Sequence, residues 1–172
     1  MTRATNARVA GFTQFFYFAV GIASLGMAGS SHVTGVLTLS TSLSALVLGV
    51  TFYSITREQD RDLAMLALTC RIIEGIPGDL GGMGEIYSAM GTTLFSWLLL
   101  RGRLIPVALA WFGVLASGLL VIILPLWRSG LFGGPMTWSD PVTWFVHLPL
   151  LVFELGLASW LLIKGVAIPA TR

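Results

Sequence analysis

Arg71 is the residue whose type and position most clearly point to chemistry, because it lies inside an apolar stretch, LAMLALTCRIIEG. Every other Lys or Arg can be placed in a water-facing connection. At the centre of a bilayer a full positive charge costs about 2.5–3.5 kcal/mol, so Arg71 should have a buried acidic partner. Glu74 lies one helical turn away, and Glu154 is a second acid within an apolar stretch, LLVFELGLASWLL. The sequence leaves open which carboxylate pairs with Arg71.

Two interpretations of this candidate polar centre follow from the residue types. One is a structural ion pair that joins the third apolar segment to the last. The other is a centre that binds a ligand or moves a proton, since ionisable residues inside a membrane are candidates for function.

A second set of polar residues is predicted near the opposite, outer ends of the segments. It comprises His32, Asp79, Glu85, Asp140 and His147. Two histidines and three carboxylates are ligand types for zinc or iron. However, the spacing contains no HExxH, no histidine pair at i,i+4 and no CxxC. We therefore predict no metal and no catalytic residue here, and we assign no cofactor.

Composition defines the class of protein. Hydrophobic residues make up 55% of the 172 residues, charged residues only 10%, and the mean hydropathy is +0.85. Soluble domains carry about 25% charged residues, so this is predicted to be an integral membrane protein whose main partner is lipid. The net charge of +2 reflects arginines in connections and indicates no nucleic-acid partner.

Apolar runs bounded by charge or by glycine and proline divide the chain into six segments. They are approximately residues 9–28, 33–55, 63–78, 84–100, 105–126 and 142–163. A rival count merges the third and fourth into one broken span across the glycine-rich linker GIPGDLGGMGE. The predicted fold is an all-α membrane protein, a six-transmembrane-helix bundle forming a single transmembrane domain over residues 1–172.

The distribution of basic residues favours six spans over five. With six spans, eight of the ten Lys and Arg residues fall on one side. They are Arg3, Arg8, Arg57, Arg61, Arg101, Arg103, Lys164 and Arg172. The positive-inside rule then predicts that the N-terminus and C-terminus are both cytoplasmic, with the chain multi-pass in a bacterial inner membrane. Arg71 and Glu154 each lie ten residues from a cytoplasmic end, at about 15 Å depth.

Small residues recur at every fourth position in the fourth segment, at Gly84, Ser88, Thr92 and Ser96. This pattern is typical of close helix packing in lipid. The linker before it is predicted to be the most mobile or most functionally exposed part of the chain, because its glycines carry a high entropic cost.

Four stretches resemble a widespread bacterial six-helix membrane family known only as a domain of unknown function. They are RVAGFTQFFYF, LALTCRIIEG, SWLLLRGRLIPVALAWFGVLASG and LLVFELGLASWLLIKGV. The resemblance implies six helices, an arginine in the third (Arg71) and a glutamate in the sixth (Glu154), and it implies no activity. The chain departs from the family in its tight first outer connection and its short third and fourth helices.

Three functions remain open from the sequence. The first is a small-molecule-binding or lipid-binding module, or a carrier, organised around Arg71, Glu74 and Glu154. The second is an accessory or assembly subunit of a larger membrane complex, with other membrane subunits as partners. The third, less favoured because no catalytic motif is present, is an intramembrane enzyme with Glu74 or Glu154 as base and His147 assisting.

Overall fold

A computed structural model describes residues 2–26, 31–76, 83–131 and 140–167. Within these ranges the chain is all-α and contains six helices, as the sequence predicts. They are α1 (Arg3–Gly26), α2 (Ser31–Thr56), α3 (Arg61–Glu74), α4 (Met83–Arg101), α5 (Val107–Arg128) and α6 (Pro141–Ile163).

Two helix ends differ by more than two residues from the predicted segments. Helix α1 begins at Arg3, six residues before the apolar run, because polar and basic side chains at a helix end reach water without breaking the backbone hydrogen bonds. Helix α3 ends at Glu74, before the predicted 78. Pro77 disfavours helical backbone in the residue before it, so a helix stops early. Of the glycine-rich linker at residues 75–85, residues 77–82 lie outside the described residues.

Three of the described helices are long and apolar enough to cross a membrane, at His32–Thr56, Val107–Arg128 and Pro141–Ile163. The structure is therefore compatible with membrane insertion. Helix α3 has only 14 residues, which corresponds to about 21 Å at 1.5 Å per residue. Because a hydrocarbon core is about 30 Å thick, the 14 helical residues of α3 do not by themselves extend across one.

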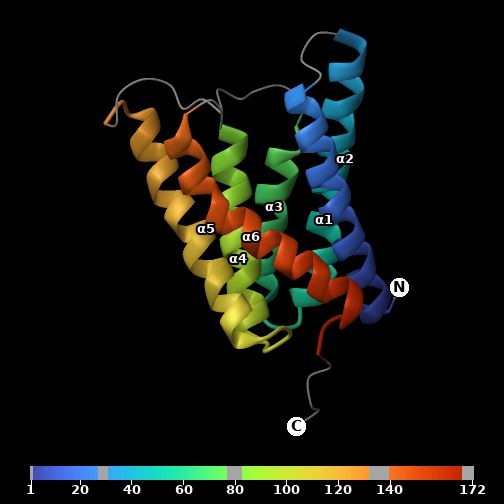
Figure 1. Ribbon diagram of the computed structural model, residues 1–172. Helices are drawn as coiled ribbons and strands as arrows, with labels where there is room; N and C mark the ends of the chain where they lie inside the picture. The colour runs from blue at the N-terminus through green and yellow to red at the C-terminus, as the bar shows by residue number, and fades with distance from the viewer. Residues whose placement is uncertain (1, 27–30, 77–82, 132–139, 168–172) are drawn as a thin grey trace.

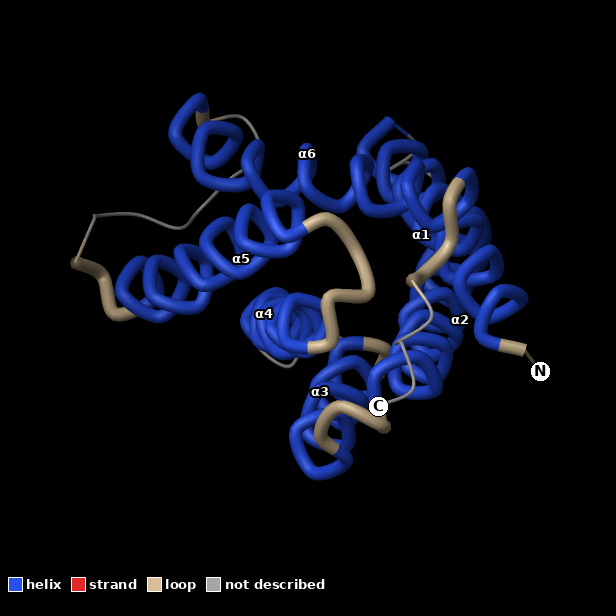
Figure 2. Tube along the Cα trace, turned by 90° about the horizontal axis from the view of Figure 1, so that it is seen from below, coloured by secondary structure: helices blue, strands red, loops and turns tan. Residues whose placement is uncertain are grey.

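The helices run side by side, and each one contacts the next along the chain, with α6 closing the ring against α1 (Figures 1 and 2). The start of α1 and the end of α6 lie at the same end of the bundle (Figure 1). We call this the terminal end and its opposite the far end. Two surface ion pairs lie at the terminal end, Arg3 with Glu58 and Arg101 with Asp60.

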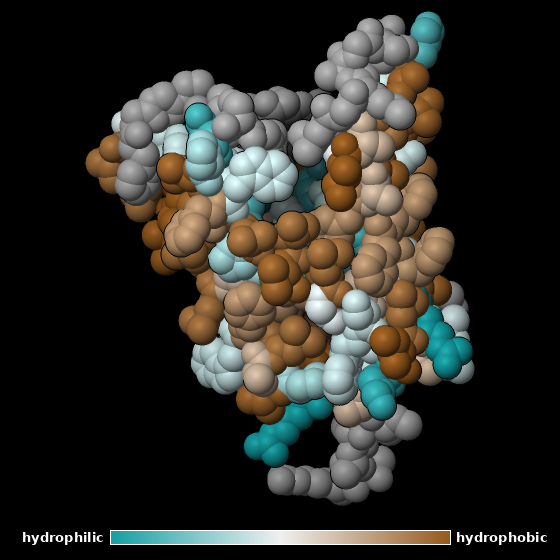
Figure 3. Space-filling view, viewed as in Figure 1, coloured by the Kyte–Doolittle hydropathy of each residue, from teal (hydrophilic) through white to brown (hydrophobic). Residues whose placement is uncertain are grey.

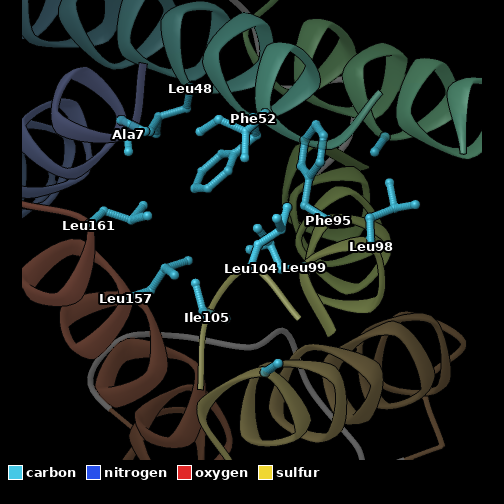
Figure 4. Close-up of a cluster of buried hydrophobic side chains, with 14 of the residues drawn as sticks. Ala7, Leu48, Phe52, Phe95, Leu98, Leu99, Leu104, Ile105, Leu157 and Leu161 are labelled. Atoms are coloured by element: carbon cyan, nitrogen blue, oxygen red, sulfur yellow. The ribbon is translucent and has the colours of Figure 1, made fainter. Parts of the chain in front are cut away.

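The main hydrophobic core fills the terminal half of the ring (Figure 4). Leu48 and Phe52 of α2, Phe95 of α4, Ile105 of the α4–α5 connection and Leu157 of α6 point toward one another there. Toward the far end, a smaller apolar cluster joins only α4, α5 and α6, through Ala89, Leu120, Leu124 and Val146. The interior is thus most completely filled in its terminal half.

Helices α5 and α6 approach closely at Gly113. A Cβ placed there would collide with the ring of Phe153 and would lie 2.7 Å from Ser96 Oγ. Because overpacking a filled core costs about 1–3 kcal/mol, Gly113→Ala should lower the free energy of unfolding by that amount. Unfolding of the purified protein by SDS would measure it.

Gly118 provides a matched control on the same helix, because a Cβ there would meet no atom within 4 Å among the described residues. Gly118→Ala should be neutral or slightly stabilising, since alanine favours a helix over glycine by about 1 kcal/mol. Equal effects of the two substitutions would show that the α5–α6 contact at Gly113 is wrong.

Candidate functional site

Arg71 lies in the last turn of α3 and is 3% exposed. Its Nη1 donates to Glu74 Oε2 at 2.8 Å and, more weakly, to Ser88 Oγ at 3.4 Å. Its Nη2 donates to Thr92 Oγ1 at 2.7 Å. The same Nη2 lies 3.9 Å from Glu154 Oε1 on α6. The buried salt bridge expected from the sequence is present, and both carboxylates take part in it.

Two glycines allow the stem of Arg71 to pass between its neighbouring helices. A Cβ on Gly49 of α2 would lie 2.9 Å from Arg71 Cβ, and one on Gly91 of α4 would lie 3.5 Å from Arg71 Cγ. Helix α3 is therefore held closely on both sides, and this packing directs the guanidinium toward α4 and α6.

Glu74 receives a second hydrogen bond, which the sequence did not predict. Tyr17 on α1 donates its hydroxyl to Glu74 Oε1 at 2.9 Å, across 57 residues of chain. The only signal for this contact was a tyrosine within the first apolar run. With Tyr17, the polar centre draws side chains from four helices: α1, α3, α4 and α6.

Glu154 is held less firmly than Glu74. Its separation of 3.9 Å from Arg71 Nη2 is an ionic contact without a hydrogen bond. Thr92, which accepts from Arg71, also interacts with the Glu154 carboxylate. Glu154 thus joins the network through its ion pair with Arg71 and through the Thr92 hydroxyl.

The interpretation of the α4 small-residue pattern as packing was incomplete. Ser88 and Thr92 turn their hydroxyls to Arg71 and belong to the polar centre. A Cβ on Gly84 would meet no described atom within 4 Å, so Gly84 makes no close helix contact. Ser96, which lies against Gly113, fits the packing interpretation. The spacing alone does not separate these roles, because small hydroxyl residues serve both packing and hydrogen bonding.

The polar centre contains more acid than base. Within the described residues it holds one guanidinium, from Arg71, and two carboxylates, from Glu74 and Glu154. It also lies at the C-terminal end of α3, where the helix dipole contributes about half a negative charge. With both carboxylates ionised, the centre is net negative.

Two buried donors in this region have no hydrogen-bond partner among the described residues, Arg71 Nε and Gln14 Nε2. Gln14 is 2% exposed. On α1 it lies between Gly11, which packs against Ala158 of α6, and Tyr17, which reaches Glu74. Because residues three apart share a helix face, the Gln14 amide faces the interior between α6 and the polar centre.

The polar centre lies between a filled half and a less filled half of the bundle. The main apolar core occupies the terminal half. Toward the far end, the space-filling view shows a recess between α1 and α6 with hydrophilic atoms at its floor (Figure 3). A Cβ on Gly21, in the far half of α1, would meet no described atom within 4 Å. Among the described residues, the apolar packing is therefore less complete on the far side of the centre than on the terminal side.

The outer-face candidates differ in their exposure within the described residues. His32, Glu85 and Asp140 are exposed, and His147 is half-buried with its Nδ1 2.8 Å from the carbonyl oxygen of Thr143. Asp79 lies outside the described residues. In the described ranges, no three His, Cys, Asp or Glu side chains are placed to hold a metal ion.

Tyr17→Phe tests the link between α1 and the polar centre. Because a hydrogen bond to a charged group contributes about 1.5–3 kcal/mol, we expect a loss of stability in that range on SDS unfolding. Tyr53→Phe, at a residue packed against the main apolar core, is the control and should change stability by less. An unchanged stability of Tyr17→Phe would mean that the hydroxyl does not bind Glu74.

The fold and the buried ion pair define a helical protein compatible with membrane insertion, with ionisable residues enclosed by its helices. Comparison with protein families also assigns the chain to a family. The chain belongs to the family described as Domain of unknown function DUF4386, which matches residues 78–165. No curated protein and no solved structure matches the chain.

The matched segment covers only part of the polar centre. Ser88, Thr92 and Glu154 lie within it, whereas Tyr17, Arg71 and Glu74 precede it. The family description carries no activity, so a function must be argued from the geometry.

Proposed function

We propose that this protein is a multi-pass integral membrane protein of six spans that binds a small molecule at the polar centre, as a binding module or a carrier. Both termini are cytoplasmic in this proposal, which makes the terminal end the cytoplasmic end. The proposed site is formed by the side chains of Tyr17, Arg71, Thr92 and Glu154.

The observation that carries the proposal is the enclosure of three ionisable side chains by the helices. Arg71, Glu74 and Glu154 have side chains that are 3%, 6% and 10% exposed. Apolar residues of similar volume are often at least as stabilising as a buried ion pair. Stability alone therefore gives little reason for this centre, whereas ligand recognition requires such groups.

The location of the centre supports binding in particular. In membrane carriers, ligands bind near the membrane midplane where helices are interrupted. Here Arg71 lies ten residues from Arg61, at about 15 Å from the start of α3, and α3 ends one turn later. At this end of α3 Arg71 is buried, whereas Ile72 and Ile76 are exposed.

Topology is tested with two acidic residues that occupy equivalent places in neighbouring helices. Asp62 and Glu85 lie in the first turns of α3 and α4. In a Cys70→Ala background, we expect Glu85→Cys to react with an impermeant maleimide from outside intact cells. Asp62→Cys should react only after the membrane is opened. Labelling of Asp62→Cys from outside would rule out this topology.

Binding is tested by thermal stabilisation of the purified protein with cationic, anionic and neutral probes, namely ethylammonium, acetate and glycerol. At least one should raise the melting temperature. Thr92→Val should weaken that effect, because Thr92 is a hydrogen-bonding partner within the site.

Thr93→Val is the matched control, since the Thr93 hydroxyl bonds instead to Ala89 O and Ser117 Oγ. Equal weakening by both variants, or no stabilisation by any probe, would contradict a binding site at the polar centre. Stoichiometric copurification of another membrane polypeptide with no solute binding would favour an accessory subunit instead.

A further inference from the structure

We propose that the ligand of the polar centre is a monovalent cation, and that it binds in exchange for a proton on Glu154. This inference rests on the proposed binding function and names its ligand class.

The charge balance favours a cation over an anion. Arg71 offers one positive charge against the two carboxylates of Glu74 and Glu154. The C-terminal end of α3 adds further negative potential. An anion would increase this imbalance, whereas one positive charge removes it. A divalent ion would leave the centre net positive, so a monovalent ion fits best.

The hydrogen bonds identify Glu154 as the acid that takes up the proton or the cation. Glu74 accepts from both Arg71 and Tyr17, one bond to each oxygen, and is therefore satisfied in its ionised form. Among the described residues, Glu154 has only the 3.9 Å contact with Arg71 and the interaction with Thr92. It thus has lone pairs to share with a cation or a proton.

The groups around Glu154 come from each side of the centre. Helix α3 supplies Arg71 and Glu74, α4 supplies Thr92, and α1 supplies Tyr17, which is bonded to Glu74. Carboxylate and hydroxyl oxygens are ligands for hard cations. A small organic ammonium carries the same single charge and donates hydrogen bonds to the same oxygens.

Gln14 provides the independent observation that points to a ligand. Its amide is 2% exposed, its Nε2 has no described partner, and it faces the interior between α6 and the polar centre. A buried polar group without a partner is costly. A half-turn of the amide presents its oxygen in place of its nitrogen, which supplies a cation with a neutral oxygen ligand.

The exchange conserves charge. With Glu154 protonated, Arg71 and the ionised Glu74 balance each other. When the cation enters, the O–H bond of the Glu154 carboxyl breaks, the proton leaves to water, and the carboxylate oxygen takes the cation. One positive charge replaces another. Lower pH must therefore weaken cation binding, because protons compete for the same oxygen.

Proton release on cation addition is the direct test. The purified protein in detergent, weakly buffered and with a pH indicator, is titrated between pH 5 and 9 with sodium, potassium or ethylammonium chloride. N-methylglucamine chloride controls for ionic strength. We expect release of up to one proton per chain by at least one cation. At pH values where Glu154 is mostly protonated, the cation concentration that gives half-maximal proton release should rise about tenfold for each unit by which the pH is lowered.

Three variants distinguish cation binding at Glu154 from a general effect of acidic residues on proton release. Glu154→Gln should abolish release, and Glu154→Asp, which keeps a carboxylate, should retain it with altered affinity. Glu85→Gln removes an exposed acid on α4 and should release protons as the unmodified protein does. A cooperative thermal unfolding transition at a similar temperature in the unmodified protein and in Glu154→Gln would show that the variant is folded.

Two results would overturn the inference. One is the absence of cation-specific proton release throughout this pH range, and the other is undiminished release by folded Glu154→Gln. Stabilisation by acetate or glycerol through Thr92, without proton release, would leave the binding function standing and refute the cation. Binding of none of the probes would refute both. Proton release by sodium or potassium would identify the ligand as an alkali ion, and release by ethylammonium would identify it as an amine.

Discussion

Arg71→Leu should lower the free energy of unfolding by about 3–5 kcal/mol, because it leaves two buried carboxylates without their cation. SDS unfolding of the purified protein measures this loss. Arg128→Leu is the control, since Arg128 is an exposed arginine at the end of α5, and it should have a much smaller effect.

The geometry also predicts which second substitution restores stability. Adding Glu74→Gln to Arg71→Leu should recover more than adding Glu154→Gln, because Glu74 makes the 2.8 Å hydrogen bond and Glu154 the 3.9 Å contact. Removal of all three charges should recover most of the loss, since an apolar substitute for a buried ion pair is often neutral or better. Full recovery by Glu154→Gln alone would mean that Glu74 is not the main partner of Arg71.

The second large effect is an asymmetry between the two acids. Glu74→Gln weakens two charged hydrogen bonds, from Arg71 and Tyr17, each contributing about 1.5–3 kcal/mol. We expect a loss of about 3 kcal/mol. Glu154→Gln should cost less than about 1 kcal/mol, because Arg71 keeps Glu74 and Thr92. SDS unfolding of the two variants at the same pH compares them directly.

The outcome that would contradict this asymmetry is a larger loss for Glu154→Gln than for Glu74→Gln. Glu58→Gln serves as the control, since it alters a pair with Arg3 at the surface. Such surface pairs contribute about 0–1 kcal/mol.

Much of the fold was predictable because membrane helices carry a local signal. Six apolar runs became six helices in the described residues, and α6 ends at Ile163 as predicted. The end of α3 was placed too late because an apolar run does not reveal where the backbone stops being helical. Whether all six helices span a membrane stays a prediction, since three meet the criteria of length and apolarity.

The charged members of the polar centre were predictable for the same reason. A charge within an apolar run is conspicuous, so Arg71, Glu74 and Glu154 could be selected without a structure. Tyr17 and Gln14 were not selected, because such residues are common within apolar helices. Their role depends on contacts with distant helices, since Tyr17 reaches Glu74 on α3 and Gln14 lies beside the contact of Gly11 with α6. On α2, the hydroxyls of Ser44 and Thr56 bond to carbonyls one turn back in the same helix.

The most direct test of the central claim is whether a small cation in water reaches the polar centre from the far end. In a Cys70→Ala background, Ser88→Cys is exposed to a membrane-impermeant trimethylammonium methanethiosulfonate on the side that carries Glu85. Ser117→Cys is the control, because Ser117 is 0% exposed and lies between α4 and α5. We predict modification of Ser88→Cys from that side and none of Ser117→Cys. Absence of modification, or modification only from the side that carries Asp62, would contradict a ligand site open to the far end.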